Sequence, residues 1–426
     1  GMNNQRLELV ADFYEYTMAN GYFNKNMEDK IAYFDVFFRK VPNEGGYAIV
    51  AGLEQIINYI RNLSFDEEDI SYLRKQNKFS EEFLNYLENF RFTGDIWAIP
   101  EGTVVFPNEP LITVKAPIIQ AQLLETMLLL TTNHQSLIAT KTSRIVKEAQ
   151  GRPVMEFGAR RAHGINAAVE GARAAIIGGA VGTSCTLSAK EFNVPASGTM
   201  AHSWIQSFDS EYEAFKAYAE LYPDDCTFLI DTYNTIESGL PNAIKVFNEV
   251  LKPKGYRPKA VRLDSGDLAY LSKKVRKILD EAGYEDCKIC ATNSLDEYLI
   301  KSLIEQDAKI DLFGVGENLI TAKSEPVFGG VYKLVALEKD KKIVPKIKVS
   351  ENTAKVTNPS FKKVYRFYDN ETKKAIADVI TLADEIIDER EYMIFDPQNP
   401  WKKKVLKDYS IRLLQEKIFE ERKINI

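Results

Sequence analysis

The chain has 426 residues, of which 45% are hydrophobic and 27% are charged, a composition typical of a globular protein with a large core. Its 55 Lys and Arg residues against 61 Asp and Glu residues give a net charge of −6, which argues against a nucleic-acid-binding protein. Because no apolar run is long enough for a membrane span and the N-terminus lacks a signal-peptide pattern, we expect a cytoplasmic protein. Only Cys287 and Cys290 form a C-x-x-C pair and no second pair completes a zinc site, so we expect buried or incidental thiols and not metal ligands.

Residues 1–117 predict an α+β domain. Apolar residues at helical spacing predict a helix over residues 5–23, which includes Tyr14. An aromatic and β-branched run predicts a strand over residues 32–38, and Arg39 follows its end.

Sequence signals for two helix N-termini and for short strands complete the prediction for this domain. Ser64 and Glu67 have the spacing of a capping box, and Ser80 precedes a second helical pattern. Prolines between residues 96 and 115 predict short edge strands and turns. Residues 118–150 then predict a long helix with one apolar face.

Residues 118–335 predict a catalytic β/α barrel. Short apolar strands alternate with helical stretches, and each strand ends in polar or glycine-containing residues. A closed or nearly closed barrel places all these ends on one face, whereas an open doubly wound sheet is the alternative. The predicted strand ends are 154–158, 180–184, 198–200, 228–231, 261–267, 289–293 and 312–316.

The C-terminal segment, residues 336–426, is expected to pack against the N-terminal domain and to complete it. Strand-like sequences occur at residues 347–350 and 365–367. Residues 410–421 predict a charged amphipathic helix.

The stretch 261–268 concentrates candidate functional residues at one strand end. Arg262 and Asp264 are two residues apart, so on a strand they point to the same side. Ser265 and Gly266 follow, and the glycine permits a tight turn or a close approach to a ligand. This combination suits a phosphorylated, metal-bound substrate, while solvated charges at an ordinary strand–turn are the alternative.

Other strand ends carry further candidates. Phe157 is suited to stacking on a flat ring, and Arg160 and Arg161 are suited to binding an acid or a phosphate. His202 follows the predicted strand end at 198–200, although a lone histidine is more often structural. Asp231 follows a strongly apolar strand, where a carboxylate needs a cation, a metal or hydroxyl donors.

The late strand ends have the composition of a phosphate site. Asn293 and Ser294 follow one strand, and Gly314 and Gly316 lie at the end of the next. Backbone N–H groups at glycine turns attract anions, and phosphate sites of barrels often lie at these strands. Glu317 is expected to point away from such a phosphate.

Together these motifs resemble those of the nicotinate phosphoribosyltransferase family, over nearly the whole chain. Several ordered motifs are far more specific than any one of them. The matching stretches are 11–14, 156–161, 198–203, 230–233, 262–267 and 313–316.

The resemblance implies an irregular α/β barrel of the type II phosphoribosyltransferase kind beside an α+β domain. It also implies a homodimer with shared active sites. The implied reaction transfers phosphoribosyl from 5-phosphoribosyl-1-diphosphate to nicotinate, giving nicotinate mononucleotide and diphosphate. ATP is the implied co-substrate, coupled through phosphorylation of a histidine, and Mg²⁺ is the implied metal.

The resemblance assigns the catalytic residues by their place in the motifs. His202 matches the phosphorylated histidine. Asp231 and Asp264 match residues that serve the ribose hydroxyls and Mg²⁺, directly or through water. Arg262 matches a residue near the diphosphate.

The resemblance also implies how nicotinate is bound. Phe157 and Tyr14 of the partner subunit would enclose the pyridine ring. Arg160 and Ser184 would hold its carboxylate, with Arg161 as a further cation.

For the 5-phosphate, the resemblance implies Arg39, Ser294 and Gly316. Glu317 and Asn318 depart from the small and hydroxyl residues expected there. The other residues predicted to line the substrate site are Thr183, Ser265, Gly266, Asn293 and Gly314.

Three alternatives remain. A nicotinamide phosphoribosyltransferase is expected to carry an acidic residue where this chain has Ser184, because a carboxylate accepts from an amide but repels an acid. A quinolinate phosphoribosyltransferase is expected to be shorter, with a denser basic site. A non-catalytic barrel scaffold is expected to have lost active-site residues, whereas His202, Asp231 and Asp264 are all present.

Overall fold

The computed structural model describes residues 6–346 and 358–420, and the chain divides into two compact units. Unit 1 consists of Gly1–Ser136 and Val327–Ile426, and unit 2 consists of Leu137–Pro326. The three-domain division expected from the sequence stays a prediction.

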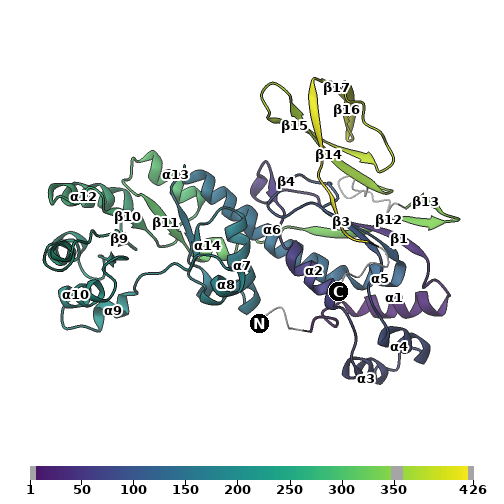
Figure 1. The fold of residues 1–426 in the computed structure, drawn as a ribbon, viewed down its shortest axis with the longest axis horizontal. Helices are drawn as coiled ribbons and strands as arrows, with labels where there is room; N and C mark the ends of the chain where they lie inside the picture. The colour runs from purple at the N-terminus through teal and green to yellow at the C-terminus, as the bar shows by residue number, and fades with distance from the viewer. Residues whose placement is uncertain (1–5, 347–357, 421–426) are drawn as a thin grey trace. The chain divides into compact units, whose positions relative to one another are not determined.

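Unit 1 is built on a six-stranded sheet in the order β13-β12-β1-β5-β3-β19 (Figure 1). Its central strand β1 confirms the strand expected at 32–38 and is buried along almost its whole length. The neighbours of β1, which are β12 and β5, both pair with it in antiparallel fashion. The strands of the sheet are β1 (Ile31–Phe38), β3 (Asp95–Ala98), β5 (Ile112–Pro117), β12 (Gly330–Lys339), β13 (Lys342–Pro345) and β19 (Glu416–Phe419), and the short strands β2 (Ala48–Ile49) and β4 (Val104–Val105) form a separate pair.

The helices of unit 1 begin at polar caps, but two predicted starts were wrong. The first helix begins at residue 13 and not at 5, because the Asp12 and Glu15 side chains form a capping box there. The third is capped by Asp66, whose carboxylate accepts from the Asp69 backbone, and not by Ser64. Ser80 caps the fourth, as predicted. These helices are α1 (Phe13–Asn24), α2 (Leu53–Asn62), α3 (Glu67–Lys75), α4 (Glu81–Glu88) and α5 (Ile118–Leu123), with a short turn of helix η2 (Pro42–Glu44).

The C-terminal part of unit 1 is made of strands. The helix predicted over 410–421 was wrong, because residues 409–413 pair with β14 and residues 416–419 pair with β3. The end of the described chain therefore packs against the N-terminal part of unit 1. The strand expected at 347–350 lies outside the described residues. The strands of this part are β14 (Lys362–Asp369), β15 (Ala375–Leu382), β18 (Tyr409–Leu413), and the hairpin of β16 (Glu391–Asp396) and β17 (Asn399–Lys407).

Unit 2 is built on a parallel sheet in the order β7-β6-β11-β10-β9-β8, and helices lie on either side of β9, β10 and β11 (Figure 1). The first strand of the unit, β6, pairs with the last, β11. The strand order is therefore cyclic, and among the described residues β7 and β8 are the only consecutive strands of this sheet that do not pair. Residues 198–200 form no strand, contrary to prediction, and only Ala196 pairs with Thr183 in an isolated parallel bridge. The strands are β6 (Val154–Glu156), β7 (Gly182–Thr183), β8 (Thr227–Leu229), β9 (Ala260–Leu263), β10 (Lys288–Ala291) and β11 (Leu312–Val315).

Helices follow these strands as the sequence predicted. The long helix α6 (Glu125–Glu148) runs from unit 1 into unit 2. The others are α7 (Ile165–Ile177), α8 (Thr186–Phe192), α9 (His202–Gln206), α10 (Glu211–Leu221), α11 (Leu240–Val246), α12 (Leu268–Glu281), α13 (Glu297–Glu305) and α14 (Glu317–Ile320), with short helical turns η3 (Ala159–Arg161), η4 (Thr235–Gly239), η5 (Phe247–Leu251) and η6 (Lys252–Lys254).

The cysteines confirm one expectation from composition. Cys287 and Cys290 are buried free thiols, and burial raises the pKa of each to about 12. Among the residues that the structure describes, no helix combines the length and the apolar character that a membrane crossing needs.

Candidate functional site

The carboxyl ends of β8, β9 and β10 bring their following residues together, because these strands are parallel neighbours in register. Leu229 pairs with Arg262, and Leu263 pairs with Ala291. Polar side chains that come directly after paired strands therefore meet at one edge of the sheet.

His202 contacts two of these strand ends. It is the first residue of α9, and its Nδ1 lies 2.9 Å from the Thr232 Oγ1 atom. Its Nε2 lies 3.3 Å from an oxygen of Asp264, whose other oxygen accepts from Thr292 Oγ1 at 2.5 Å. The His202 and Asp264 side chains keep 39% and 32% of their surface exposed, so this group is accessible from solvent.

Asp231 lies beside this group and is more deeply buried, with 8% exposure. Its Oδ2 accepts from the Asp264 backbone N–H and from Ser265 Oγ, each at 2.7 Å. Its Oδ1 is buried and has no hydrogen-bond partner among the described residues. One carboxylate oxygen thus fixes the turn after β9, and the other remains for a cation or a hydroxyl donor.

Arg262 is held by the segment that follows Ala196. Its Nη1 donates to Thr199 Oγ1 at 2.5 Å and to the Met200 carbonyl oxygen at 3.1 Å. This contact brings the irregular segment 195–200 next to β9, because Arg262 lies within that strand. The Nε atom of Arg262 is buried and makes no hydrogen bond in the described part of the chain.

Glu156 organises the ends of β6 and β7, and sequence analysis gave it no role. Its side chain is fully buried, with 0% exposure, and one oxygen accepts from the Gly158 backbone N–H. The other accepts from Thr183 Oγ1 at 2.7 Å, and Thr183 Oγ1 in turn accepts from the Cys185 N–H at 3.0 Å. Burial raises the pKa of the Glu156 carboxyl, while these donors act to lower it.

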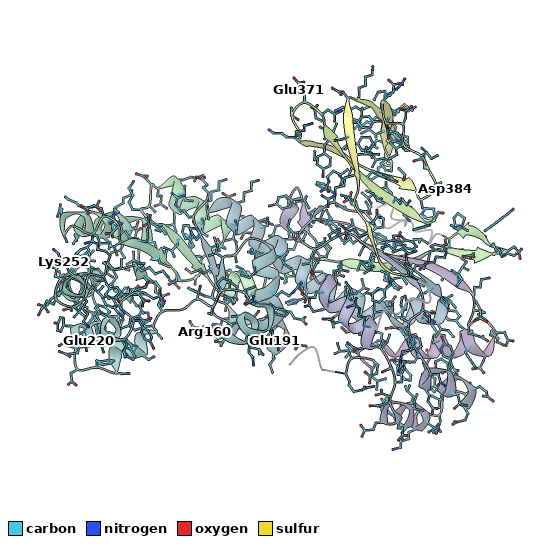
Figure 2. All side chains as sticks on the ribbon, in the orientation of Figure 1. Arg160, Glu191, Glu220, Lys252, Glu371 and Asp384 are labelled. Carbon is cyan, nitrogen blue, oxygen red and sulfur yellow. The ribbon has the colours of Figure 1, made fainter. Side chains whose placement is uncertain are left out.

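The residues predicted to bind the pyridine ring and its carboxylate follow these two strands. A Cβ atom on Gly314 would lie 2.5 Å from the Phe157 ring, so only glycine leaves room for this ring position. Arg160, Arg161 and Ser184 are exposed, and Figure 2 labels Arg160. Among the described residues, their side chains make no hydrogen bond or ion pair with the His202 group.

The predicted phosphate loops lie after β10 and β11. Asn293 and Ser294 both have positive φ, 81° and 47°, and the Ser294 Oγ lies 3.3 Å from the Asn293 side chain. The Asn318 amide donates to the carbonyl oxygen of Ser294 at 3.0 Å. Glu317 is exposed, 4.0 Å from Arg161 and 3.6 Å from Lys323 in its ion pairs, which balance its charge.

The two predicted residues of unit 1 lie on separate elements. Tyr14 is 46% exposed on α1. Arg39 follows β1, and its guanidinium lies 5.4 Å from the centre of the Phe37 ring.

Unit 1 also contains a cluster of carboxylates formed by Glu8, Asp66 and Asp69, whose oxygens lie within 4.8 Å of one another. Arg6 lies 2.8 Å from Glu8 and 3.2 Å from Asp66. Because this guanidinium already compensates the carboxylates, we interpret the cluster as structural.

Glu156, Thr232 and Thr292 were not predicted from the sequence, and Asn318 had no predicted function beyond its departure from the family pattern. Glu156 carried a usable signal, because a carboxylate at the end of an apolar strand needs donors. No sequence signal predicts the contacts of Thr232 and Thr292, because these contacts depend on which strands are neighbours in the sheet.

The chain matches three family models. A model described as the nicotinate phosphoribosyltransferase (NAPRTase) N-terminal domain matches residues 9–133. The nicotinate phosphoribosyltransferase (NAPRTase) family model matches residues 153–381, and the C-terminal domain model matches residues 361–425.

Curated relatives and a solved structure agree with these matches. The nicotinate phosphoribosyltransferase of Bacillus subtilis (strain 168) is 46% identical over 422 residues, which covers 99% of this chain and 86% of that protein. The protein of the same name from Homo sapiens is 30% identical over 88% of this chain and 80% of its own length. A crystal structure of human nicotinic acid phosphoribosyltransferase has a TM-score of 0.84 at 26% identity, covering 96% of this chain and 89% of that one. With an extensive family match and this degree of identity over almost its full length, the chain belongs to the nicotinate phosphoribosyltransferase family.

Proposed function

We propose that this chain transfers the phosphoribosyl group of 5-phosphoribosyl-1-diphosphate to nicotinate in a reaction coupled to ATP hydrolysis. The products are nicotinate mononucleotide and diphosphate. The observation that carries this proposal is the contact of His202 with Asp264 beside the unsatisfied oxygen of Asp231, all at neighbouring strand ends.

The reaction needs charge stabilisation and orientation more than a protein nucleophile. The pyridine nitrogen forms a bond to C1 of the ribose while the bond from C1 to the diphosphate oxygen breaks, through an oxocarbenium-like state. Asp231 and Asp264 are suited to binding the ribose hydroxyls, and Arg262 is suited to the negative charge of the diphosphate.

The site also fits Mg²⁺. Hard cations prefer carboxylate oxygens, and Asp231 Oδ1 is a buried carboxylate oxygen with no protein partner in the described chain. Asp231 and Asp264 would hold the ion, directly or through water, and the bound ion would neutralise charge on the leaving diphosphate. Water and substrate oxygens would complete its ligands.

His202 is the proposed acceptor of the ATP γ-phosphate. A nitrogen lone pair of the imidazole forms a bond to phosphorus, the bond from phosphorus to the bridging oxygen breaks, and ADP leaves. Hydrolysis of the phosphohistidine by water then gives orthophosphate. Asp264 beside Nε2 favours a proton on that nitrogen, which leaves the lone pair on Nδ1 next to Thr232.

Specificity for the acid is assigned to Ser184, Arg160 and Arg161. The exposed side chains of Arg160 and Ser184 can donate to a substrate carboxylate, which accepts hydrogen bonds but donates none. Arg161 lies 4.0 Å from Glu317 and would be a further cation. Phe157 would cover one face of the pyridine ring, next to Thr183. Tyr14 of the partner subunit would cover the other face if the protein forms the homodimer expected of the family.

The 5-phosphate is assigned to the loops after β10 and β11, with Ser294 and Gly316 and with Arg39 as its cation. Asn293 and Gly314 shape these loops, and Ser265 and Gly266 shape the turn after β9. The positive φ of Gly266, 83°, is tolerated by glycine at little cost.

The sheet of unit 2 is proposed to close into an irregular β/α barrel. The pairing of β6 with β11 and the cyclic strand order support closure. Between β7 and β8, the segment 195–200 bridges to Thr183 on one side and contacts Arg262 on the other. We further propose the division into a barrel over 118–335 and an α+β domain over 1–117 that is completed by 336–426.

A turnover assay tests the function. Purified protein is incubated with 5-phosphoribosyl-1-diphosphate and either nicotinate or nicotinamide, with and without ATP. We expect nicotinate mononucleotide, and faster turnover with ATP. A preference for nicotinamide would favour the amide enzyme, and no turnover of either substrate would favour a non-catalytic scaffold.

A further inference from the structure

The loops that follow β10 and β11 are tied together by one side chain, Asn318. Its Nδ2 group donates to the carbonyl oxygen of Ser294 at 3.0 Å and to that of Leu295 at 3.2 Å. Because β10 and β11 are parallel neighbours, their following loops leave the sheet side by side. Asn318 therefore bridges two loops that the proposed function assigns to the 5-phosphate.

The loop after β10 needs this support because its backbone is strained. Asn293 and Ser294 have φ values of 81° and 47°, in the left-handed region that residues with a Cβ atom rarely adopt. Such a conformation persists only where the surroundings hold it. Asn318 binds the carbonyl oxygens of Ser294 and of the residue after it, so it holds the strained turn directly.

The same contacts orient the backbone donors of the loop. In a trans peptide, the carbonyl group and the following N–H point in opposite directions. Since the carbonyl groups of Ser294 and Leu295 face Asn318, the N–H groups of Leu295 and Asp296 face away from it. These two N–H groups donate to no acceptor in the described part of the chain. Asp296 is partly exposed, so its N–H is available to an anion, whereas Leu295 is buried.

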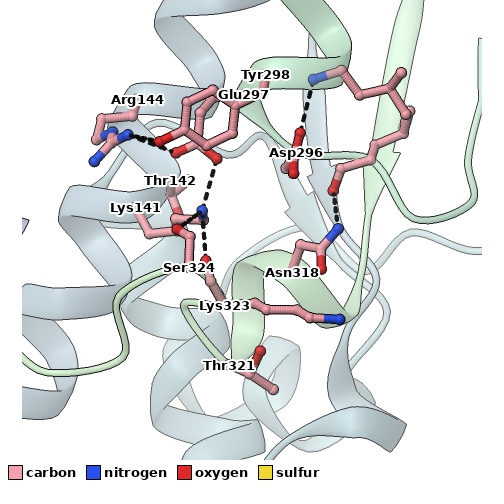
Figure 3. A network of polar contacts seen from close by, with 12 residues as sticks. Lys141, Thr142, Arg144, Asp296, Glu297, Tyr298, Asn318, Thr321, Lys323 and Ser324 are labelled. Atoms are coloured by element: carbon pink, nitrogen blue, oxygen red, sulfur yellow. Dashed lines mark hydrogen bonds and ion pairs between the residues drawn. The ribbon is translucent and has the colours of Figure 1, made fainter. Parts of the chain in front are cut away.

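A buried network frames the same loops from α6 (Figure 3). The Lys141 Nζ lies 2.7 Å from a Glu297 oxygen and donates to the Lys323 carbonyl at 2.9 Å and to Ser324 Oγ at 3.2 Å. Lys141 and Glu297 are only 3% and 4% exposed, so the pair forms a rigid anchor. Glu297 follows the loop after β10, and Lys323 follows α14, so Lys141 links the two segments that come after these strand ends.

We infer that Asn318 is a positioning residue for the 5-phosphate end of 5-phosphoribosyl-1-diphosphate. It sets the loop after β10 so that the Asp296 backbone N–H meets the phosphate, and it does not act on the diphosphate or on nicotinate. The inference rests on the proposed function and adds to it the cause of the loop geometry. It also gives a reason for an asparagine at this position, since the side-chain amide supplies two donors.

The inference is tested without turnover by measuring the binding of ribose 5-phosphate and of diphosphate, which represent the two ends of 5-phosphoribosyl-1-diphosphate. Isothermal titration calorimetry measures the affinity of the full chain for ribose 5-phosphate and, separately, for inorganic diphosphate. Asn318→Ala removes both hydrogen bonds and should weaken ribose 5-phosphate binding about tenfold, with diphosphate binding unchanged. A general loss of structure would weaken both ligands, so the split identifies a positioning role.

Asn318→Asp is the second variant, because it keeps the shape of the side chain and lacks the N–H donors. It should lose at least as much affinity for ribose 5-phosphate. Asn89→Ala is the matched control: the Asn89 amide donates to the Asn85 carbonyl at 3.1 Å within its own helical region, and its loss should change neither affinity.

Unchanged ribose 5-phosphate affinity in both Asn318 variants would overturn the inference. So would a wild-type protein that binds no ribose 5-phosphate. In either case, turnover of nicotinate by the wild-type protein decides separately whether the proposed function stands.

Discussion

Two buried carboxylates beside strands, Asp35 in unit 1 and Asp231 in unit 2, use their oxygens differently. In unit 1, Asp35 is 2% exposed, with one oxygen 2.8 Å from the Lys362 Nζ and the other accepting from Thr113 Oγ1 at 2.8 Å. In unit 2, Asp231 is 8% exposed, and its Oδ1 has no partner in the described chain. A buried carboxylate whose oxygens are both bonded stabilises the fold. We interpret the spare oxygen of Asp231, at a parallel strand end, as the position of a ligand.

Removing the charge of Asp231 should have the largest effect on activity. Asp231→Asn keeps the shape and one acceptor for the turn after β9 but removes the anionic oxygen. We expect kcat to fall about 10²–10³-fold, the scale for losing a preorganised electrostatic contact, with a thermal unfolding temperature close to wild type. Steady-state kinetics and a thermal melt measure both quantities. Wild-type kcat in the folded variant would remove Asp231 from the active site.

Breaking the ion pair of Asp35 and Lys362 in unit 1 should lower stability and leave activity unchanged. Lys362→Met leaves Asp35 buried without its cation, and the free energy of unfolding should fall by about 3–5 kcal/mol. The kcat of the folded fraction should stay unchanged. Chemical denaturation measures the first quantity, and the double variant Asp35→Leu/Lys362→Met should recover most of the stability. An activity loss without a stability loss would contradict the comparison.

Ser184 allows a smaller and more selective change. Its backbone N–H is already bonded to the Glu156 carbonyl at 3.0 Å, so its exposed side chain can change without breaking that contact. Ser184→Asp places a negative charge beside the substrate carboxylate and should lower kcat/KM for nicotinate about a hundredfold. The value for nicotinamide should fall far less.

Ser184→Ala is the control for Ser184→Asp, since it removes the hydroxyl without adding charge. Its effect should be the smaller of the two. Equal losses for nicotinate and nicotinamide in Ser184→Asp would show that Ser184 only packs at the strand end.

A pH dependence of stability is predicted at Glu109 in unit 1. Burial, followed by the neighbouring Asp378, raises the pKa of the Glu109 carboxyl from 4.5 to about 9. Between these pH values the unfolded chain releases the proton while the folded chain retains it, so the wild type loses stability as pH rises. Glu109→Gln should remove this contribution, and its advantage in melting temperature should grow from pH 5 to 9. Parallel melting profiles of the two proteins would show that Glu109 is ionised in the fold.

Much of unit 2 could be predicted because its strands are short apolar runs that end in polar or glycine residues. The strand expected at 198–200 was wrong because this segment bonds through Ala196 and through Arg262, not through a ladder of its own. Asp231 and Asp264 were identified individually, but the 2.7 Å contact between the Asp264 N–H and Asp231 depends on β8 and β9 being neighbours.

Unit 1 was predicted less well at its C-terminal end. Residues 410–421 have a charged, amphipathic sequence typical of a surface helix. In the structure, pairing with β14 and β3 overrides this local preference, which is weak compared with tertiary hydrogen bonding. The start of α3 was misplaced because Asp66 and Asp69 offer the same capping spacing as Ser64 and Glu67, two residues further along.

The ATP dependence of nicotinate mononucleotide formation in wild type and His202→Ala tests the proposed role of His202 in the transfer reaction. Product is quantified by chromatography, together with ADP, in the presence of nicotinate and 5-phosphoribosyl-1-diphosphate. We expect that ATP accelerates the wild type, and that His202→Ala forms product at an ATP-independent rate and releases no ADP. ATP stimulation that persists in His202→Ala, or a wild-type protein that forms no nicotinate mononucleotide, would contradict this role.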